Sequence, residues 1–266
     1  MGEVRKVKDT LLNRTVAMKL IHSKLISDEQ SRRRFMHEAQ VISQLQHPNI
    51  LPVYDYGSLE DERLYFTMSE IQGHSLEFYI KRSHQIQSVT QGKESDHPWN
   101  MHKLISALYD VVKSIAYAHE HGVLHRDLKS SNVMIGSLGE VMVVDWGLAE
   151  LYSRDSISKY GPKARVELTG HDRDLQRTEL CGTPRYLAPE LAQMNGAQPS
   201  PQTEIYALGV ILYEILVGQL PYKDLTLSQL IKAVSTQGLS PIPRHKPDKH
   251  QQREELSAIG VPLPNR

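Results

Sequence analysis

The chain has 266 residues, of which 39% are hydrophobic and 23% are charged, so it is long enough to bury a sizeable core. Basic and acidic residues number 31 each, and a formal net charge of zero argues against a basic face for nucleic acid or an anionic membrane. A single cysteine, Cys181, excludes an internal disulfide, and without a signal peptide or a long apolar span we expect a cytoplasmic protein that does not cross a membrane.

The first apolar segment, residues 16–21, predicts a β-strand that carries one lysine at its centre. Its side chains are apolar apart from Lys19, and two are β-branched, which suits a strand facing a protein core. A buried amine is costly without an anionic partner. We therefore expect a carboxylate to pair with Lys19.

A helix is predicted next, over residues 28–46. Phe35, Ile42 and Leu45 recur at helical spacing, and Glu38 falls on or beside the buried stripe that they form. A glutamate considered alone would more often be a solvated helix charge. Its place in the stripe, together with the motifs further along the chain, favours a pair between this glutamate and the buried lysine.

The rest of the chain predicts one more strand, a loop and two long helices. Residues 64–68 form an apolar strand, and residues 84–98, rich in glutamine, serine and charge, predict an exposed loop between helices. Residues 101–121 carry one apolar stripe and predict a helix that packs on a core. Residues 203–217 are apolar nearly all round, which indicates a buried central helix that ends at Gly218.

Chemistry-bearing residues concentrate in one short loop and at the end of the following strand. Residues 125–132 are His-Arg-Asp-Leu-Lys-Ser-Ser-Asn, and an apolar run after them ends in Asp145-Trp146-Gly147. An acid, a lysine and an asparagine in one loop, with a second acid at a strand end, are what phosphoryl transfer from ATP with two magnesium ions requires. Ordinary loop polar residues would rarely occur in this order with matching elements before and after them.

With these motifs the chain resembles, nearly from end to end, a eukaryotic-type (Hanks-type) serine/threonine protein kinase in the style of the bacterial members. The resemblance implies an α+β fold of two lobes, a small β-rich lobe with one key helix and a larger, mainly helical lobe. We expect one kinase domain over residues 1–266. The small lobe would cover residues 1–70 without its first strand, the incomplete large lobe residues 71–237, and a polar, proline-rich tail residues 238–266.

The resemblance also implies roles for four catalytic residues. Lys19 would bind the α- and β-phosphates, and Glu38 would hold that lysine in place. Asp127 would accept the proton of the substrate hydroxyl, and Lys129 would complete the loop around it.

ATP and Mg²⁺ are the implied cofactors, with Asn132 and Asp145 as the metal ligands. Met68 would lie at the back of the adenine pocket, and backbone groups of residues 69–71 would bind the adenine. The full set of nucleotide-binding residues implied in this way is Gly2, Val4, Ala17, Lys19, Met68, Ser69, Ile71, Asn132, Met134 and Asp145.

The leading function implied is MgATP-dependent transfer of the γ-phosphoryl group to serine or threonine hydroxyls of protein substrates, with no nucleic-acid partner. Residues 182–186, Gly-Thr-Pro-Arg-Tyr, followed by Ala188-Pro189-Glu190, resemble the platform that carries protein substrates. A catalytically impaired pseudokinase that binds or regulates is the alternative class. A small-molecule phosphotransferase is a third, but it would usually lack the platform.

Several positions depart from the family pattern. Of the phosphate-covering GxGxxGxV loop only residues 2–4, Gly-Glu-Val, are present, and Trp146 replaces a phenylalanine. Glu204 replaces an aspartate and reaches one methylene further, which would cost about 1 to 3 kcal/mol in a packed interior that cannot expand. Glu179 stands where related kinases often carry a phosphorylated threonine, so we expect its carboxylate to replace phosphate against Arg126.

Overall fold

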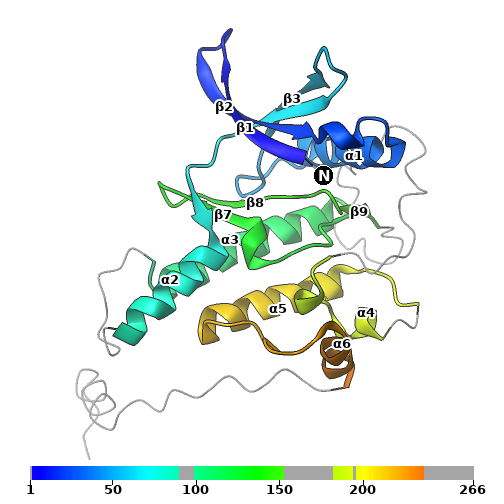
Figure 1. The fold of residues 1–266 in the computed structure, drawn as a ribbon. Coiled ribbons are helices and arrows are strands. Elements are labelled where there is room, and N and C mark those ends of the chain that lie inside the picture. Colours follow the sequence, from blue (N-terminus) through cyan, green and yellow to red (C-terminus); the bar gives the residue numbers. More distant parts are fainter. Residues whose placement is uncertain (1, 90–98, 153–181, 194–195, 237–266) are drawn as a thin grey trace, which may run out of the picture.

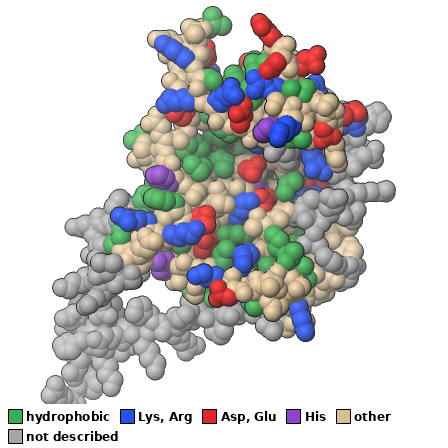
Figure 2. All heavy atoms as spheres, in the orientation of Figure 1, with side chains coloured by type: hydrophobic (Ala, Val, Ile, Leu, Met, Phe, Trp, Pro, Cys, Tyr) green, Lys and Arg blue, Asp and Glu red, His purple; other side chains and the backbone are tan. Residues whose placement is uncertain are grey.

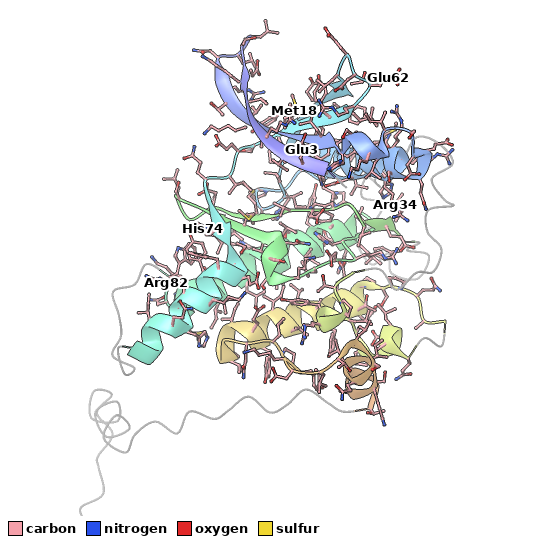
Figure 3. All side chains as sticks on the ribbon, viewed as in Figure 1. Glu3, Met18, Arg34, Glu62, His74 and Arg82 are labelled. Atoms are coloured by element: carbon pink, nitrogen blue, oxygen red, sulfur yellow. The ribbon has the colours of Figure 1, made fainter. Side chains whose placement is uncertain are left out.

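The computed structural model describes residues 2–89, 99–152, 182–193 and 196–236 of the chain. An antiparallel sheet with one helix forms one part, and a larger, mainly helical part lies against it (Figure 1). His74, in the short strand before the first helix of the larger part, lies where the chain passes from the sheet to the helices (Figure 3). The expected two-lobe α+β fold is therefore confirmed.

The sheet has four antiparallel strands in the order β1-β2-β4-β3. They are β1 (Gly2–Asp9), β2 (Arg14–Ile21), β3 (Val53–Ser58) and β4 (Leu64–Met68). Val4, Lys19 and Phe66 lie side by side on three neighbouring strands, which places Lys19 in the middle of the sheet. Both strands expected from the sequence are present.

Helix α1 (Glu29–Gln44) packs against this sheet after a short 3₁₀ turn. Asp28 caps it, because its carboxylate accepts a hydrogen bond from a backbone N–H of the first turn. On the buried face, the ring of Phe35 lies 5.1 Å from the ring of Phe66, and Glu38 is only 2% exposed. The prediction that Glu38 belongs to the buried stripe is therefore confirmed.

The helical part is built around the contact between α3 and α5. Its helices are α2 (Leu76–Val89), α3 (Met101–Glu120), α4 (Pro189–Ala192), α5 (Pro201–Val217) and α6 (Leu227–Thr236). Helix α3 buries Leu104, Val111 and Ile115 in the shared core, as its apolar spacing predicts. Each helix in the described parts of the chain is too short or too polar to cross a membrane.

Short strands and turns between the helices carry the polar loop of residues 125–132, called here the Asp127 loop. The strands are β5 (Gly73–Ser75), β6 (Val123–Leu124), β7 (Val133–Gly136), β8 (Val141–Val143) and β9 (Glu150–Leu151), and 3₁₀ turns cover Ser130–Asn132 and Pro184–Tyr186. Strand β7 pairs with β5 and β8, and β6 pairs with β9. The Asp127 loop therefore runs from β6, which pairs with β9, to β7, which pairs with β8. Strand β8 in turn ends shortly before Asp145.

The predicted loop at residues 84–98 is wrong for its first part, because α2 continues to Val89. His84 bonds the carbonyl of Ile215 through Nε2 at 2.8 Å, which ties this end of α2 to α5. The stretch is polar, but a helix needs only one buried face, and Ile80 one turn earlier supplies part of it. The remainder of the predicted loop lies outside the described residues.

Helix α5 is present but is not buried on all sides, which corrects the sequence prediction. Val210 and Ile211 are fully buried, whereas Ile205 is 60% exposed and Leu212 is 37% exposed within the described structure. An apolar composition shows that a helix can be buried, but the elements packed around it decide which faces are. Gly218 ends the helix at a φ of +78°, as predicted.

Candidate active site

A cleft of about 620 Å³ lies between the sheet and the segments around β7 and β8. Figure 2 shows it as a hollow beneath the sheet, with hydrophobic side chains in its wall. The wall is mostly apolar and carries a few charged groups, among them Lys19, Glu38 and Asp145. This combination is the usual form of a small-molecule site that fixes a ligand by a few polar contacts.

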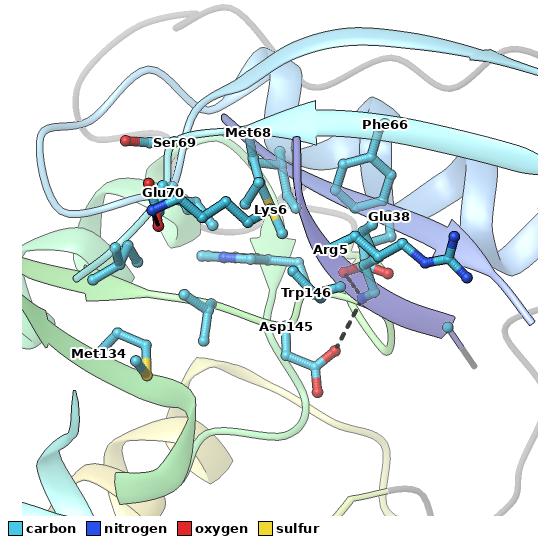
Figure 4. A pocket seen from close by; sticks show the side chains of 18 residues that line it. Arg5, Lys6, Glu38, Phe66, Met68, Ser69, Glu70, Met134, Asp145 and Trp146 are labelled. Atoms are coloured by element: carbon cyan, nitrogen blue, oxygen red, sulfur yellow. Dashed lines mark hydrogen bonds and ion pairs between the residues drawn. The ribbon is translucent and has the colours of Figure 1, made fainter. Parts of the chain in front are cut away.

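Lys19 and Glu38 meet within the cleft. Lys19 Nζ donates a hydrogen bond to Glu38 Oε1 at 2.6 Å, and the two side chains are 14% and 2% exposed. Burial raises the pKa of Glu38, and the adjacent Lys19 ammonium offsets part of that rise. Lys19 Nζ also lies 3.7 Å from Asp145 Oδ1 (Figure 4). One largely buried amine is thus shared between two carboxylates.

Asp145 is held in the cleft by a sharp backbone turn. Its φ is +64°, in the left-handed region that favours glycine, and its side chain is 52% exposed. The next residue, Trp146, is fully buried, with its ring 4.6 Å from that of His125 and its Nε1 donating to the carbonyl of Val143. Such a conformation persists only where the surroundings fix it, so the packing of Trp146 anchors Asp145.

The side chains of the Asp127 loop hold one another in place. Asn132 Nδ2 donates to the carbonyl of Asp127 at 2.8 Å and to its Oδ2 at 3.2 Å. Lys129 Nζ donates to the same Oδ2 at 2.5 Å. Asp127 is 9% exposed, so these contacts fix its carboxylate in one orientation.

Thr183 completes a triangle with two of these residues. Its Oγ1 donates to Asp127 Oδ1 at 2.8 Å and accepts a hydrogen bond from Lys129 Nζ at 2.9 Å. Thr183 precedes the 3₁₀ turn Pro184–Tyr186, so the triangle joins the predicted substrate platform to the Asp127 loop. The carboxylate of Asp127 therefore already accepts a hydrogen bond from an alcohol, the hydroxyl of Thr183.

Glu204 supports the same loop from α5. Its Oε1 accepts a hydrogen bond from the backbone N–H of Arg126 at 2.6 Å, and its Oε2 bonds His119 Nε2 at 2.7 Å. The residue is 4% exposed, and both oxygens are in use. The extra methylene therefore lets one carboxylate reach the loop and α3 together. The sequence gives no signal for the contact with His119.

The predicted site residues fall into two adjoining groups. The cleft wall contains Gly2, Val4, Ala17, Lys19, Glu38, Met68, Ser69, Ile71, Met134 and Asp145. Asp127, Lys129 and Asn132 lie beside the wall in the Asp127 loop, which is joined to the segment before Asp145 by a bond from Val144 N to the carbonyl of Asn132 at 2.9 Å. At Gly2 a Cβ would lie 2.3 Å from the Leu20 carbonyl oxygen, so a side chain would force the strands apart.

Sequence reasoning missed an ion pair in the wall of the cleft. Lys6 Nζ lies 2.7 Å from Glu70 Oε1, and both side chains line the cleft (Figure 4). The position of Lys6 in the cleft wall could have been inferred from the sequence, because side chains two residues apart on a strand share a face. Lys6 follows Val4 at that spacing, and Val4 was expected to face the nucleotide.

The oxygen atoms around Asp145 suit Mg²⁺ held together with a phosphate-bearing ligand. The described residues include no group of three or more His, Cys, Asp or Glu that could enclose a metal by themselves. Mg²⁺ usually takes only one or two protein oxygens and completes its shell with phosphates and water. The carboxylate of Asp145 is open to the cleft, and Asn132 uses its amide nitrogen on Asp127, which leaves its amide oxygen as a ligand atom. The residues present therefore fit Mg²⁺.

Comparison with known proteins places these features in one family. The family described as "Protein kinase domain" matches residues 1–259. The chain is 36% identical over 236 residues to serine/threonine-protein kinase PknD of Protochlamydia amoebophila, a match that covers 88% of this chain and 24% of the relative. It is also 36% identical over 236 residues to PknD of Chlamydia muridarum, covering 84% of this chain and 24% of that relative. The chain thus spans about a quarter of the length of these curated relatives.

Proposed function

Since the chain belongs to the protein kinase domain family, we propose that it transfers the γ-phosphoryl group of MgATP to serine and threonine hydroxyls of protein substrates. One observation carries the proposal: Lys19, Glu38 and Asp145 form a single charged group in the cleft, beside the loop that holds Asp127. A cation for phosphates, a carboxylate for the metal and a carboxylate for the acceptor are the minimum that phosphoryl transfer requires.

In this proposal the residues around the nucleotide have distinct tasks. Lys19 would bind the α- and β-phosphate oxygens, because Glu38 fixes its amine beside the open cleft. Asp145 and Asn132 would offer oxygens to Mg²⁺, which when bound neutralises charge on the phosphates. The apolar wall around Met68 and Met134 would exclude water from the adenine.

Asp127 would orient the acceptor hydroxyl and take its proton. The bond from Thr183 Oγ1 to Asp127 Oδ1, at 2.8 Å, supports this role because an alcohol already donates to that oxygen. Lys129, 2.5 Å from the other oxygen of Asp127, would offset negative charge that develops as the phosphoryl group moves. The contact of Thr183 with both residues would place a protein substrate, bound along the following platform, next to them.

The same proposal includes lobe boundaries at residues 1–70 and 71–237, ATP and Mg²⁺ as cofactors, protein partners without nucleic acid, and action in the cytoplasm. A non-catalytic kinase-like module would more often lack one of the charged groups. All of Lys19, Asp127, Asn132 and Asp145 are present in the described residues, and nothing there favours that alternative.

The test is transfer of label from γ-labelled ATP to a mixture of protein acceptors, followed by hydrolysis and separation of the phosphorylated amino acids. We expect phosphoserine and phosphothreonine without phosphotyrosine, dependent on Mg²⁺. Lys19→Met should abolish the transfer, whereas Lys24→Met, at an exposed lysine of the first 3₁₀ turn, should leave it unchanged. Label found only on small-molecule acceptors would contradict the protein-substrate assignment, and no label at all would favour the non-catalytic alternative.

A further inference from the structure

A second ion pair lies directly behind the Asp127 loop. Arg126 Nη1 and Glu150 Oε2 are 2.7 Å apart, and the two side chains are only 14% and 15% exposed. Arg126 immediately precedes Asp127, and Glu150 is the first residue of β9, where it pairs with Leu124 of β6. The two charged groups therefore join the strand after the Asp145 turn to the residue next to the proposed base.

Arg126 needs this partner because its charge is largely removed from water. Taking one partner from a buried ion pair leaves an uncompensated charge, which is among the more disruptive changes in a protein interior. Its backbone φ is +66°, so the residue holds a conformation that non-glycine residues rarely adopt. A fixed guanidinium therefore adds to the hydrogen bond from Arg126 N–H to Glu204 in holding the backbone of the Asp127 loop.

Charge, rather than an aligned hydrogen bond, holds Glu150 in the pair. Within the described residues no group donates a well-aligned hydrogen bond to Glu150 Oε2 despite its short distance from the guanidinium. Burial raises the pKa of Glu150, and the charges of Arg126 and His37 oppose that rise. Replacing the carboxylate by an amide of the same shape would therefore remove most of the interaction.

Helix α1 holds the backbone of the residue that precedes Glu150. His37 Nε2 bonds the carbonyl of Ala149, the residue before Glu150, at 2.8 Å, and His37 is 8% exposed. His37 also precedes Glu38, the partner of Lys19, on α1. The Lys19–Glu38 pair is thus linked to the Glu150–Arg126 pair through two adjacent residues, His37 on α1 and Ala149, which bond each other.

We propose that Glu150 is the built-in counter-ion of Arg126 and a positioning residue for phosphoryl transfer. Its carboxylate fixes Arg126 and through it the backbone that carries Asp127, and its strand couples this loop to α1. Arg126 is therefore neutralised without any phosphate group, so transfer does not depend on prior phosphorylation of the chain. The inference rests on the proposed function, because its main readout is the rate of transfer.

The experiment compares Glu150→Gln with the parent under steady-state conditions. Glu150 does not line the cleft, so the KM for MgATP should stay unchanged while kcat falls roughly tenfold, the effect of about 1.4 kcal/mol at the transition state. Glu77→Gln, which breaks the exposed pair with Lys81 on α2, is the matched control and should leave both constants unchanged. The smaller Glu150→Ala should regain part of its kcat when formate is added, and chloride at equal ionic strength should not restore it.

The outcomes separate this inference from the proposed function. A parent that transfers no phosphate defeats the proposed function itself. An active parent with a Glu150→Gln variant of equal kcat overturns the inference and leaves the function intact, as does a Glu150→Ala variant on which formate has no effect. If neither variant folds, phosphatase treatment of the parent decides: retained kcat supports the built-in counter-ion, and loss of activity overturns it.

Discussion

The two aspartates of the site have different neighbours, and this predicts different defects. Asp145 is half exposed beside Lys19, where it would meet the metal, whereas Asp127 is bound within its own loop. Asp145→Asn should abolish Mg²⁺-dependent binding of nucleotide, because it removes a charge from the metal. Asp127→Asn should bind MgATP as the parent does. Titration calorimetry with a non-hydrolysable ATP analogue measures both, and undiminished binding by Asp145→Asn would contradict the metal assignment.

Glu214 predicts a pH dependence of stability. It is 3% exposed and accepts a hydrogen bond from the Tyr186 hydroxyl at 3.0 Å, and burial raises its pKa above the ordinary 4.5. The folded protein therefore binds this proton more tightly than the unfolded chain does. The resulting stabilisation is complete below pH 4.5 and is lost as the pH rises through the raised pKa.

Glu214→Gln removes the titrating group. The parent should therefore lose stability relative to the variant as the pH rises above 4.5, so that the difference in free energy of unfolding, parent minus variant, decreases. Denaturant unfolding at a series of pH values measures the difference. Glu60→Gln, the same substitution at an exposed position, serves as the control. A difference for Glu214→Gln that grows with pH would show that the carboxylate is stabilised as the anion.

At the residue scale, the sequence predicts those contacts whose partners are fixed by local periodicity. Glu38 could be assigned to Lys19 because helical spacing puts it on a buried face and the strand puts one amine in the core. The pair of Arg126 and Glu150 could not be predicted in this way, since it depends on how β6 and β9 align. Residues 153–181, with Glu179 among them, lie outside the described structure, so its predicted role as a phosphate substitute stays a prediction.

At the scale of elements, Glu204 links α5, α3 and the Asp127 loop, and this link gives a prediction that opposes the family pattern. Glu204→Asp restores the usual residue, but the shorter side chain cannot reach Arg126 N and His119 Nε2 together. Leaving one buried partner unsatisfied should lower the free energy of unfolding by about 1 to 3 kcal/mol. Glu204→Gln keeps the length and should lose less. An Asp variant more stable than the parent would show that the extra methylene is strained.

Elements with one clear apolar stripe are the ones that the sequence predicts best. Helices α1 and α3 begin and end within two residues of the predicted ranges, because capping by Asp28 and Asn100 and the apolar spacing agree. The end of α2 was missed because a polar segment gives no periodic signal, although His84 there bonds α5. The exposed face of α5 could not be predicted either, since composition does not reveal which neighbours cover a helix.

At the scale of the whole molecule, the cleft exists only when its two parts dock. The sheet and its exit contribute wall residues up to Ile71, and the helical part contributes Met134 and the segment of residues 144–146. The sequence predicts the composition of each part, and the resemblance predicts that they face each other. The contact of His37 with Ala149 crosses between the parts and joins residues 112 positions apart, so it follows from the docked structure alone.

In the proposed function, Asp127 acts on an acceptor hydroxyl while the rest of the site holds MgATP. The most direct test is the rate of γ-phosphoryl transfer by Asp127→Asn at saturating MgATP, beside the parent and the exposed control Asp224→Asn. With equal nucleotide occupancy, we expect a loss of about a hundredfold to ten-thousandfold for Asp127→Asn and no loss for the control. Transfer by Asp127→Asn at the parent rate would show that Asp127 does not act on the acceptor hydroxyl.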